Sequence, residues 1–208
     1  MIHNWADADA IHSSAAVPRK ELEWAADIDP GRPLIANVSR FGPVKRRGDL
    51  VEAMPIVLDE YPDAVAIIAG WGRGREAVEQ RIEERGLEDS VRSIGELDNP
   101  YPVYAQAEVS VLTSSAESFG LSLLEAALLE TPIVATDIPA FREVLGDDHP
   151  LVPPGDPGQL GLAIRDRLSN SAEASEIAAR TRQRVEEQFW FSRCCPTSRP
   201  VSLSRCLP

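Results

Sequence analysis

The stretch from Val109 to Asp137, VSVLTSSAESFGLSLLEAALLETPIVATD, decides the fold of this chain. It opens with a short β-branched apolar run, passes through a polar loop into an apolar segment of helical length, and closes on a second β-branched run. Two buried strands joined by a helix predict a parallel crossover, the βαβ unit.

The same alternation continues through most of the chain. Five β-rich runs predict buried strands, at Leu34–Val38, Val65–Ala69, Val91–Ile94, Val109–Leu112 and Ile133–Ala135. Amphipathic or apolar segments between them predict helices at residues 46–61, 74–86, 100–107 and 119–130. Beyond them we expect a short helix at 139–146, an edge strand at 151–152, and helices at 156–168 and 172–188. The fold class is therefore α/β, a doubly wound Rossmann-like parallel sheet with helices on both faces.

The two ends of the chain depart from this pattern. Residues 1–33 are polar and mixed and are expected to be a linker, whereas residues 34–188 form the domain. Residues 189–208 change to Ser, Pro, Cys and Arg and are expected to be an atypical, disordered tail. All three cysteines lie in that tail, in no zinc-binding or disulfide pattern.

The charge limits the partners of the protein. The 208 residues carry a net charge of −12, and all 33 acidic residues lie within residues 1–187. Such a surface repels phosphate backbones and anionic lipids, which argues against nucleic acid as a partner. Two lysines beside 19 arginines suit a halophilic cytoplasm. Because no run of 18 apolar residues and no basic-then-apolar leader occurs, we expect a cytoplasmic protein without an integral membrane segment.

Two loops at strand ends carry candidate ligand-binding residues. The loop after the strand Leu34–Val38 contains Arg40, Lys45, Arg46 and Arg47 without an acid among them. It is either a solvated basic turn or a phosphate clamp, with Arg40 at the strand end and Lys45 entering the helix.

The second loop follows the strand Val109–Leu112. Ser118 is expected to cap the next helix and to leave the N–H groups of Phe119, Gly120 and Leu121 at the mouth of the sheet. Glu125 is the lone charge of that apolar helix, so it needs a partner, either an arginine or a ligand hydroxyl. Eight helical residues would hold Glu117 and Glu125 about 12 Å apart, too far for a glycosidase pair.

Other patterns predict no chemistry. Residues 70–75 are expected to form a plain glycine turn, because Arg75 stands where a dinucleotide-binding loop needs its third glycine. His3, His12 and His149 are expected to be surface or hinge residues, and no metal site or cofactor is expected.

The spacing of Glu117 and Glu125 around Ser118-Phe119-Gly120-Leu121, with Arg40 and Lys45 five apart, resembles the donor-binding half of GT-B glycosyltransferases of family 4 (glycosyl transferases group 1). The resemblance runs from residues 2–7, similar to the interdomain hinge of that family, to about residue 188. It implies a hinge remnant at 1–33 and a nucleotide-sugar-binding domain at 34–188.

The resemblance also implies an activity and a role for each residue. The family transfers a sugar from a nucleotide-sugar donor to an acceptor hydroxyl with retention of configuration and without an obligatory metal. Arg40 and Lys45 would neutralise the departing diphosphate, and Glu117 would contact the donor sugar. The helix N-terminus at Phe119, Gly120 and Leu121 would assist, Glu125 would bind the ribose, and Gly95 to Leu97 would lie against the base.

Three features depart from the family. Arg46 stands where the family usually has a glycine after the lysine. The family also has an N-terminal acceptor domain before these motifs and a closing helix after them, whereas this chain begins at the hinge and ends in the tail. These departures predict a transferase that is either truncated or split, in which case a partner domain such as a separate acceptor-binding subunit completes it. A non-catalytic nucleotide-sugar-binding module or inactive remnant is the alternative, and a nucleotide-sugar epimerase is a third.

Overall fold

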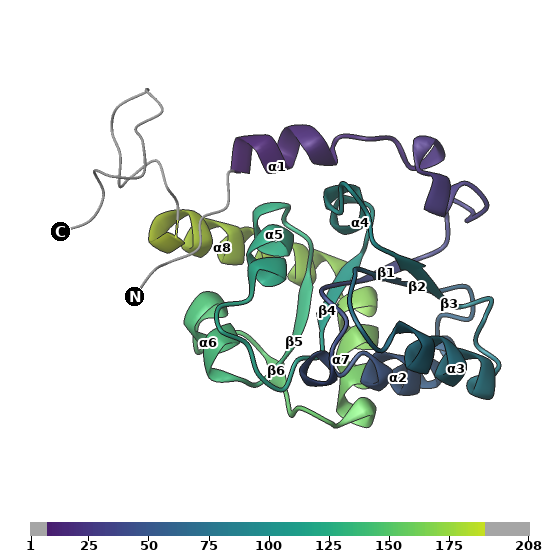
Figure 1. Cartoon of the computed structure of the whole chain (residues 1–208). Helices are drawn as coiled ribbons and strands as arrows, with labels where there is room; N and C mark the ends of the chain where they lie inside the picture. The colour runs from purple at the N-terminus through teal and green to yellow at the C-terminus, as the bar shows by residue number, and fades with distance from the viewer. Residues whose placement is uncertain (1–7, 190–208) are drawn as a thin grey trace.

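The computed structural model describes residues 8–189 and confirms the α/β fold. Its six strands form one all-parallel sheet, in the order β3-β2-β1-β4-β5-β6 (Figure 1). The strands are β1 (Leu34–Val38), β2 (Val65–Ala69), β3 (Val91–Gly95), β4 (Val109–Leu112), β5 (Ile133–Thr136) and β6 (Leu151–Val152). The strand order reverses between β1 and β4, and ligands of such sheets bind at that reversal, beyond the carboxyl ends of the strands.

The helices fall close to their predicted positions except for the first, which lies in the segment expected to be a linker. They are α1 (Ala8–Ala15), α2 (Gly48–Leu58), α3 (Arg75–Arg85), α4 (Tyr101–Ala105), α5 (Leu121–Leu128), α6 (Pro139–Leu145), α7 (Pro157–Ser169) and α8 (Ser171–Phe189). Short 3-10 turns occupy Arg19–Glu21, Glu23–Ala25 and Pro43–Lys45. The largest departure from a predicted helix is α2, which spans Gly48–Leu58 rather than residues 46–61. α5 begins at Leu121 rather than at residue 119.

Side chains alternate between two cores because successive residues of a strand point to opposite faces of the sheet. Leu34, Ala36 and Val38 pack with α4, α5, α6 and α8, whereas Ile35 packs with α2, α3 and α7. Figure 1 shows α4 on one side of the sheet and α2 and α3 on the other. Every residue of β1, β2, β4 and β5 is buried, as expected for a parallel sheet covered on both faces.

The N-terminal segment, expected to be a linker, packs on the domain. α1 lies against α4 and α5, and Ile11 and Ile28 are buried in the same core as α4. Farther along, the Arg32 guanidinium donates a hydrogen bond of 2.7 Å to the carbonyl of Asp63. Residues 8–33 are therefore held to the domain by burial and by hydrogen bonds. The hinge-like residues 2–7 lie outside the described residues.

The other end of the chain is described as far as Phe189, which ends α8, so the rest of the expected tail lies outside the described residues. Within residues 8–189, no helix combines the length and the apolar character that a bilayer crossing requires.

Candidate functional site

The loops that follow β1 and β4 lie side by side at the reversal point of the sheet. The Thr113 hydroxyl donates a hydrogen bond of 2.7 Å to the carbonyl of Lys45. The backbone N–H of Ser115 donates another, of 2.8 Å, to the carbonyl of Val44. The two predicted ligand-binding loops are thus fastened to each other although about 70 residues separate them in the chain.

Lys45 and Glu117 form an ion pair across these loops. The Lys45 ammonium contacts Oε1 of Glu117, and the Ser114 hydroxyl donates a hydrogen bond of 2.7 Å to the same oxygen. The Lys45 and Glu117 side chains are only 15% and 12% exposed. Arg40, Lys45 and Glu117 are the three residues that the resemblance makes catalytic. The structure brings together two of them, Lys45 and Glu117, and fixes their geometry by partial burial.

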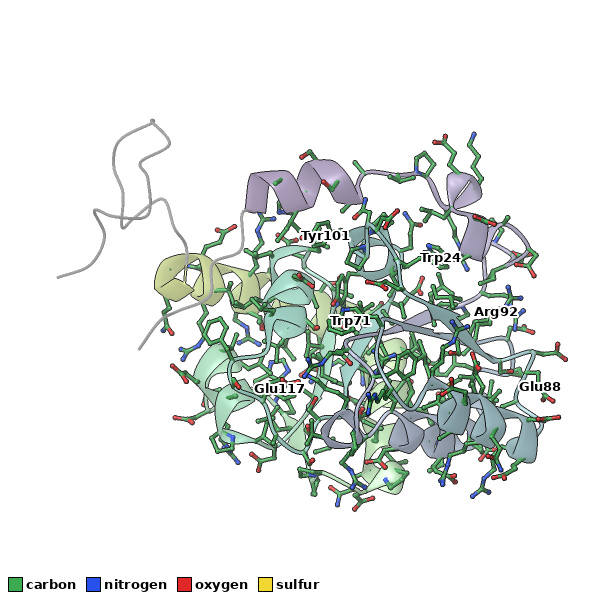
Figure 2. All side chains as sticks on the ribbon, viewed as in Figure 1. Trp24, Trp71, Glu88, Arg92, Tyr101 and Glu117 are labelled. Carbon is green, nitrogen blue, oxygen red and sulfur yellow. The ribbon has the colours of Figure 1, made fainter. Side chains whose placement is uncertain are left out.

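Arg40, the third, is exposed and lies over an aromatic ring instead. Its guanidinium carbon is 5.4 Å from the ring centroid of Trp71. Trp71, labelled in Figure 2, is 54% exposed. The backbone N–H of Phe41 donates a hydrogen bond of 2.5 Å to the Trp71 carbonyl, which joins the loops after β1 and β2. Trp71 thus holds Arg40 through a cation–π contact at the edge of the site.

The glycine turn at residues 70–75 has a steric reason. A Cβ atom on Gly70 would lie 1.8 Å from the carbonyl oxygen of Ser39, and one on Gly72 would lie 2.5 Å from that of Phe41. Both glycines also have left-handed φ angles, of 139° and 122°. The glycines are needed because the β1 loop passes directly against this turn.

Glu125 has a tyrosine as its partner. The Tyr104 hydroxyl donates a hydrogen bond of 3.2 Å to Oε2 of Glu125, and no arginine is paired with Glu125 in residues 8–189. Burial raises the pKa of Glu125 to about 7, and the hydrogen bond from Tyr104 opposes part of that rise. Of the two alternatives for the partner of Glu125, the arginine is therefore wrong, and the carboxylate retains acceptor capacity for a ligand hydroxyl.

The start of α5 corrects the predicted cap. Gly120, with φ of 91°, is the residue that precedes the helix, and no side chain caps it. Phe119 precedes the helix and packs against the core, while Leu121 is 44% exposed in the first turn. Ser118 is thus not the N-cap. Because Glu117 stands in the loop before α5, the expectation that eight helical residues join it to Glu125 is also wrong.

Of the residues predicted to lie against a base, Gly95 ends β3 and Leu97 lies in the loop that follows it. The carbonyl of Gly95 accepts a hydrogen bond of 2.6 Å from the N–H of Gly70, which places this loop beside the glycine turn. Leu97 is half-buried and packs against the core that contains α4. A Cβ atom on Gly95 would lie 2.5 Å from Nη1 of Arg75, so the arginine side chain covers it.

Arg46, which stands where the resemblance implies a glycine, has the left-handed backbone that a glycine adopts readily. Its φ and ψ angles, 46° and 38°, lie in the left-handed region. Its guanidinium donates two hydrogen bonds to the Asp49 carboxylate, of 2.7 and 3.1 Å. The local turn is therefore formed, and the paired carboxylate stabilises an arginine in a conformation that disfavours a side chain.

His149 is not a surface residue, contrary to expectation. It is buried, and its Nε2 lies 3.2 Å from the carbonyl oxygen of Ile133. Burial lowers the pKa of His149 to about 4, so the ring is neutral at physiological pH. In residues 8–189 no three His, Cys, Asp or Glu side chains come close enough to hold a metal ion.

Sequence reasoning assigned no role to Tyr104, Ser114 or Trp71. Tyr104 and Ser114 are ordinary in the sequence, because only the packing of α4 on α5 and the turn of the β4 loop bring them to Glu125 and Glu117. Trp71 could have been found from the sequence, because it stands between two glycines directly after a strand. Such a loop is exposed, and a large aromatic side chain in an exposed loop indicates a binding role.

The all-parallel sheet defines a Rossmann-like domain. The Lys45–Glu117 ion pair marks its candidate ligand site, beyond the carboxyl ends of β1 and β4. The chain belongs to the glycosyl transferases group 1 family, whose model matches residues 18–184. The fold is that of the C-terminal domain of GT-B glycosyltransferases.

Curated relatives include two bacterial transferases of different specificity. The chain is 30% identical over 171 residues to N-acetyl-alpha-D-glucosaminyl L-malate synthase of Bacillus anthracis, covering 81% of this chain and 45% of that protein. It is 33% identical over 153 residues to phosphatidyl-myo-inositol mannosyltransferase of Mycobacterium leprae, covering 71% and 40%. The chain thus spans less than half the length of these two relatives.

Solved structures show the same fold. The structure of Anabaena HepE in complex with UDP and glucose superposes with a TM-score of 0.78 at 23% identity, covering 91% of this chain and 52% of HepE. The C-terminal domain of a Francisella tularensis glycosyl transferase group 1 family protein superposes with a TM-score of 0.72 at 24% identity, covering 89% of this chain and 99% of that domain.

Proposed function

We propose that this chain is the donor-binding half of a retaining hexosyltransferase that transfers a sugar from a nucleotide-sugar to an acceptor hydroxyl. The observation that carries the proposal is the Lys45–Glu117 ion pair, held at the reversal point of the sheet by two loops fastened to each other. The family supports sugar transfer, and HepE is a fold neighbour whose structure contains UDP and glucose.

The charges present suit a nucleoside diphosphate leaving group. As the bond between the anomeric carbon and the diphosphate breaks, negative charge develops on the diphosphate, and Arg40 and Lys45 offset it. These side chains supply the positive charge that a divalent cation provides elsewhere, so the proposed transfer needs no obligatory metal. The N–H groups of the first turn of α5, at Leu121 and Ser122, add a positive partial charge.

Two glutamates divide the rest of the donor between them. Glu117, next to Lys45, contacts the sugar hydroxyls, and Glu125 accepts hydrogen bonds from the ribose hydroxyls. Since Tyr104 occupies one oxygen of Glu125, the other remains for the ligand. The loop from Gly95 to Leu97 lies against the base.

The acceptor is bound by another domain or a separate subunit. The relatives are more than twice as long as the part of them that this chain matches. A module that binds nucleotide-sugar without transferring it is the competing function, because every residue named above serves the donor alone.

Calorimetric titration of the purified chain with nucleoside diphosphates, in molar potassium chloride, tests the donor site. We expect Arg40→Ala and Glu125→Ala each to weaken binding by about 1.5 to 3 kcal/mol, the value of a charge-assisted hydrogen bond. Arg180→Ala, which removes an exposed charge on α8, is the matched control and should leave binding unchanged. Absence of binding by a folded chain would contradict the proposal.

Transfer is then measured with a nucleotide-sugar and cell extract as the source of acceptor and partner. Product with retained configuration supports the transferase. Normal donor affinity without product favours the binding module, and epimerised free donor without acceptor favours the epimerase.

A further inference from the structure

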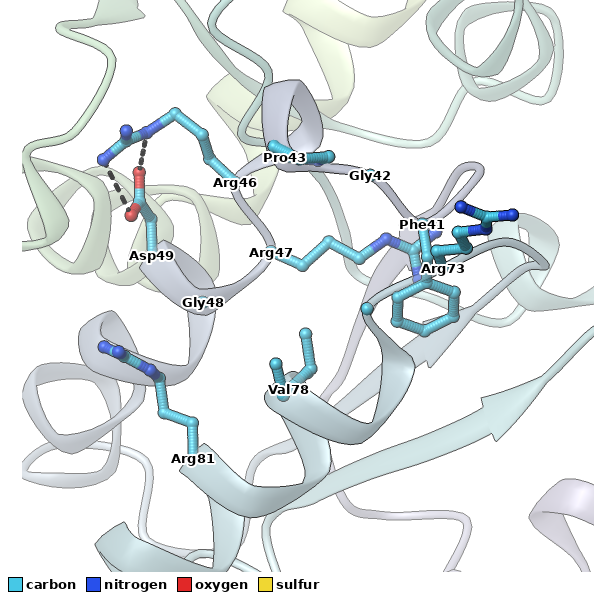
Figure 3. Close-up of a pocket in the computed structure, with 12 residues that line it drawn as sticks. Phe41, Gly42, Pro43, Arg46, Arg47, Gly48, Asp49, Arg73, Val78 and Arg81 are labelled. Atoms are coloured by element: carbon cyan, nitrogen blue, oxygen red, sulfur yellow. Dashed lines mark hydrogen bonds and ion pairs between the residues drawn. The ribbon is translucent and has the colours of Figure 1, made fainter.

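A cavity of about 710 Å³ lies between the loop after β1 and the first turns of α3 (Figure 3). Its volume is within the usual range of small-molecule pockets. The residues that line it include none of Arg40, Lys45, Glu117 and Glu125. It is therefore a separate concavity from the candidate donor site.

The lining is strongly cationic, in contrast to the acidic chain as a whole. Four arginines line the cavity against a single carboxylate, that of Asp49; they are Arg46, Arg47, Arg73 and Arg81. The net charge of the whole protein is −12. A concentration of positive charge on so acidic a protein indicates attraction of an anion to this cavity.

The carboxylates nearby do not balance these arginines. Asp49 is engaged by Arg46, and Glu52 accepts a hydrogen bond of 2.7 Å from Arg81 while also pairing with Arg85. Arg73 is exposed and has no ion pair within residues 8–189. The cavity thus keeps positive charge that no described carboxylate neutralises.

Arg47 is the most informative of the four. It is 3% exposed, lies 3.9 Å from the ring centroid of Phe41, and donates hydrogen bonds of 2.8 and 3.0 Å to the Ala69 carbonyl and the Ser39 hydroxyl. Its Nη1 has no hydrogen-bond partner among the described residues. A buried guanidinium without a carboxylate is costly, and a bound anion would offset that cost.

Two helix N-termini border the same cavity. Gly48 and Asp49 of the first turn of α2 line it, as do Gly74, which precedes α3, and Ala77. Both helices have 11 residues, so each adds a partial positive charge at its N-terminus. In α2 the N–H groups of Asp49 and Leu50 already donate to the carbonyls of Arg46 and Arg47. Arginines and two helix N-termini therefore line one cavity.

We propose that this cavity is a second binding site, for a small anion bearing a phosphate group, either inorganic phosphate or a phosphorylated small molecule. Arg73 and Arg81 bind the anion from α3 and its preceding loop, and Arg47 supplies buried positive charge beneath it. The proposal does not rest on the donor site, since the two sites share no residue.

Nuclear magnetic resonance titration of the 15N-labelled chain tests the site, with inorganic phosphate and glycerol 3-phosphate as probes. We expect phosphate to shift the amide signals of Gly48, Asp49 and Gly74. The double variant Arg73→Gln, Arg81→Gln should bind at least about tenfold more weakly, because two charged contacts are lost. Its dispersed spectrum reports that it remains folded.

Two single variants distinguish binding in this cavity from binding at the donor site and from a general effect of charge. Arg40→Ala, at the donor site, and Arg180→Gln, an equal loss of charge on α8, should leave phosphate affinity unchanged. Loss of binding in Arg40→Ala with full binding in the double variant would overturn the proposal and assign phosphate to the donor site. Equal weakening in Arg180→Gln would overturn it in favour of the general effect.

The two probes are then compared. Tighter binding of glycerol 3-phosphate than of phosphate identifies a phosphate ester as the ligand, and equal binding identifies the phosphate group alone.

Discussion

Lys45, in the loop after β1, forms an ion pair with Glu117, in the loop after β4. The two residues follow different strands, β1 and β4. The pair therefore forms only because these strands are neighbours in the sheet. The Ser114 hydroxyl bonds the same carboxylate oxygen, and both charged side chains are largely buried. The site is therefore organised before any ligand arrives, which is the arrangement expected of residues that stabilise developing charge.

Breaking this pair should destabilise the fold. Lys45→Ala leaves the Glu117 carboxylate largely buried without its cation, so we expect a loss of about 1 to 3 kcal/mol in the free energy of unfolding. A double-mutant cycle with Glu117→Ala, measured by urea denaturation, should give a coupling of about 1 kcal/mol or more. The exposed helical pair Arg75–Glu79 is the control, with an expected coupling of about 0.3 to 0.5 kcal/mol. Equal couplings would contradict the view that the Lys45–Glu117 pair is preorganised.

Trp71 should affect donor binding through Arg40. We expect Trp71→Ala to weaken nucleoside diphosphate binding by about 0.5 to 1 kcal/mol, the value of an exposed cation–π contact, and Trp71→Phe to restore most of it. Titration calorimetry of the Arg40→Ala, Trp71→Ala double variant provides the decisive comparison. If Trp71 acts only by positioning Arg40, the double variant binds as Arg40→Ala does. An additive loss would show that Trp71 contacts the ligand itself.

Gly120 should tolerate no side chain. Its φ is 91°, and a Cβ atom would lie 2.9 Å from Cε1 of Phe141, which is fully buried. Gly74 has a similar φ of 99° but open space around its Cβ position. We expect Gly74→Ala to lose about 1 kcal/mol from backbone strain alone, and Gly120→Ala to lose a further 1 to 3 kcal/mol, roughly, from overpacking. Thermal and urea unfolding measure both, and equal losses would refute the steric argument.

Glu125 should make the protein less stable as pH rises. Its folded pKa of about 7 is above the unfolded value of 4.5, so the folded state binds the proton more tightly. The contribution of Glu125 to the free energy of unfolding is therefore fully present below about pH 4.5. It declines by about 3 kcal/mol as the pH rises through the folded pKa of about 7. Urea unfolding from pH 4 to 8 should show Glu125→Gln gaining stability over the natural protein as pH rises. A difference independent of pH would contradict the raised pKa.

His149 should make the protein less stable as pH falls, the opposite of the effect of Glu125. Burial lowers its folded pKa to about 4 from 6.5, so its contribution is present above pH 6.5 and is lost as pH falls toward 4. The size is again about 3 kcal/mol. His149→Gln, which can still donate a hydrogen bond to the Ile133 carbonyl, should therefore be most stabilising, relative to the natural protein, at low pH. The same pH series measures it, and a gain at high pH instead would refute the assignment.

The sequence by itself determined the strands, the helices on both faces and the two loops that carry the site. Strand positions were predictable because a parallel sheet covered on both faces needs continuous apolar runs, as at Leu34–Val38. The family resemblance, resting on Arg40, Lys45, Glu117 and Glu125, was likewise visible in the chain and is confirmed by the family match.

Only the tertiary structure decided how these residues pair. Lys45 meets Glu117, Tyr104 meets Glu125, and Arg47 bonds the Ala69 carbonyl, all through contacts between segments that no local pattern relates. The start of α5 at Leu121 was equally hidden, because Gly120 adopts a left-handed conformation to pack under Phe141. Local periodicity sets the secondary structure, whereas side-chain partners depend on which strand ends the sheet order brings together.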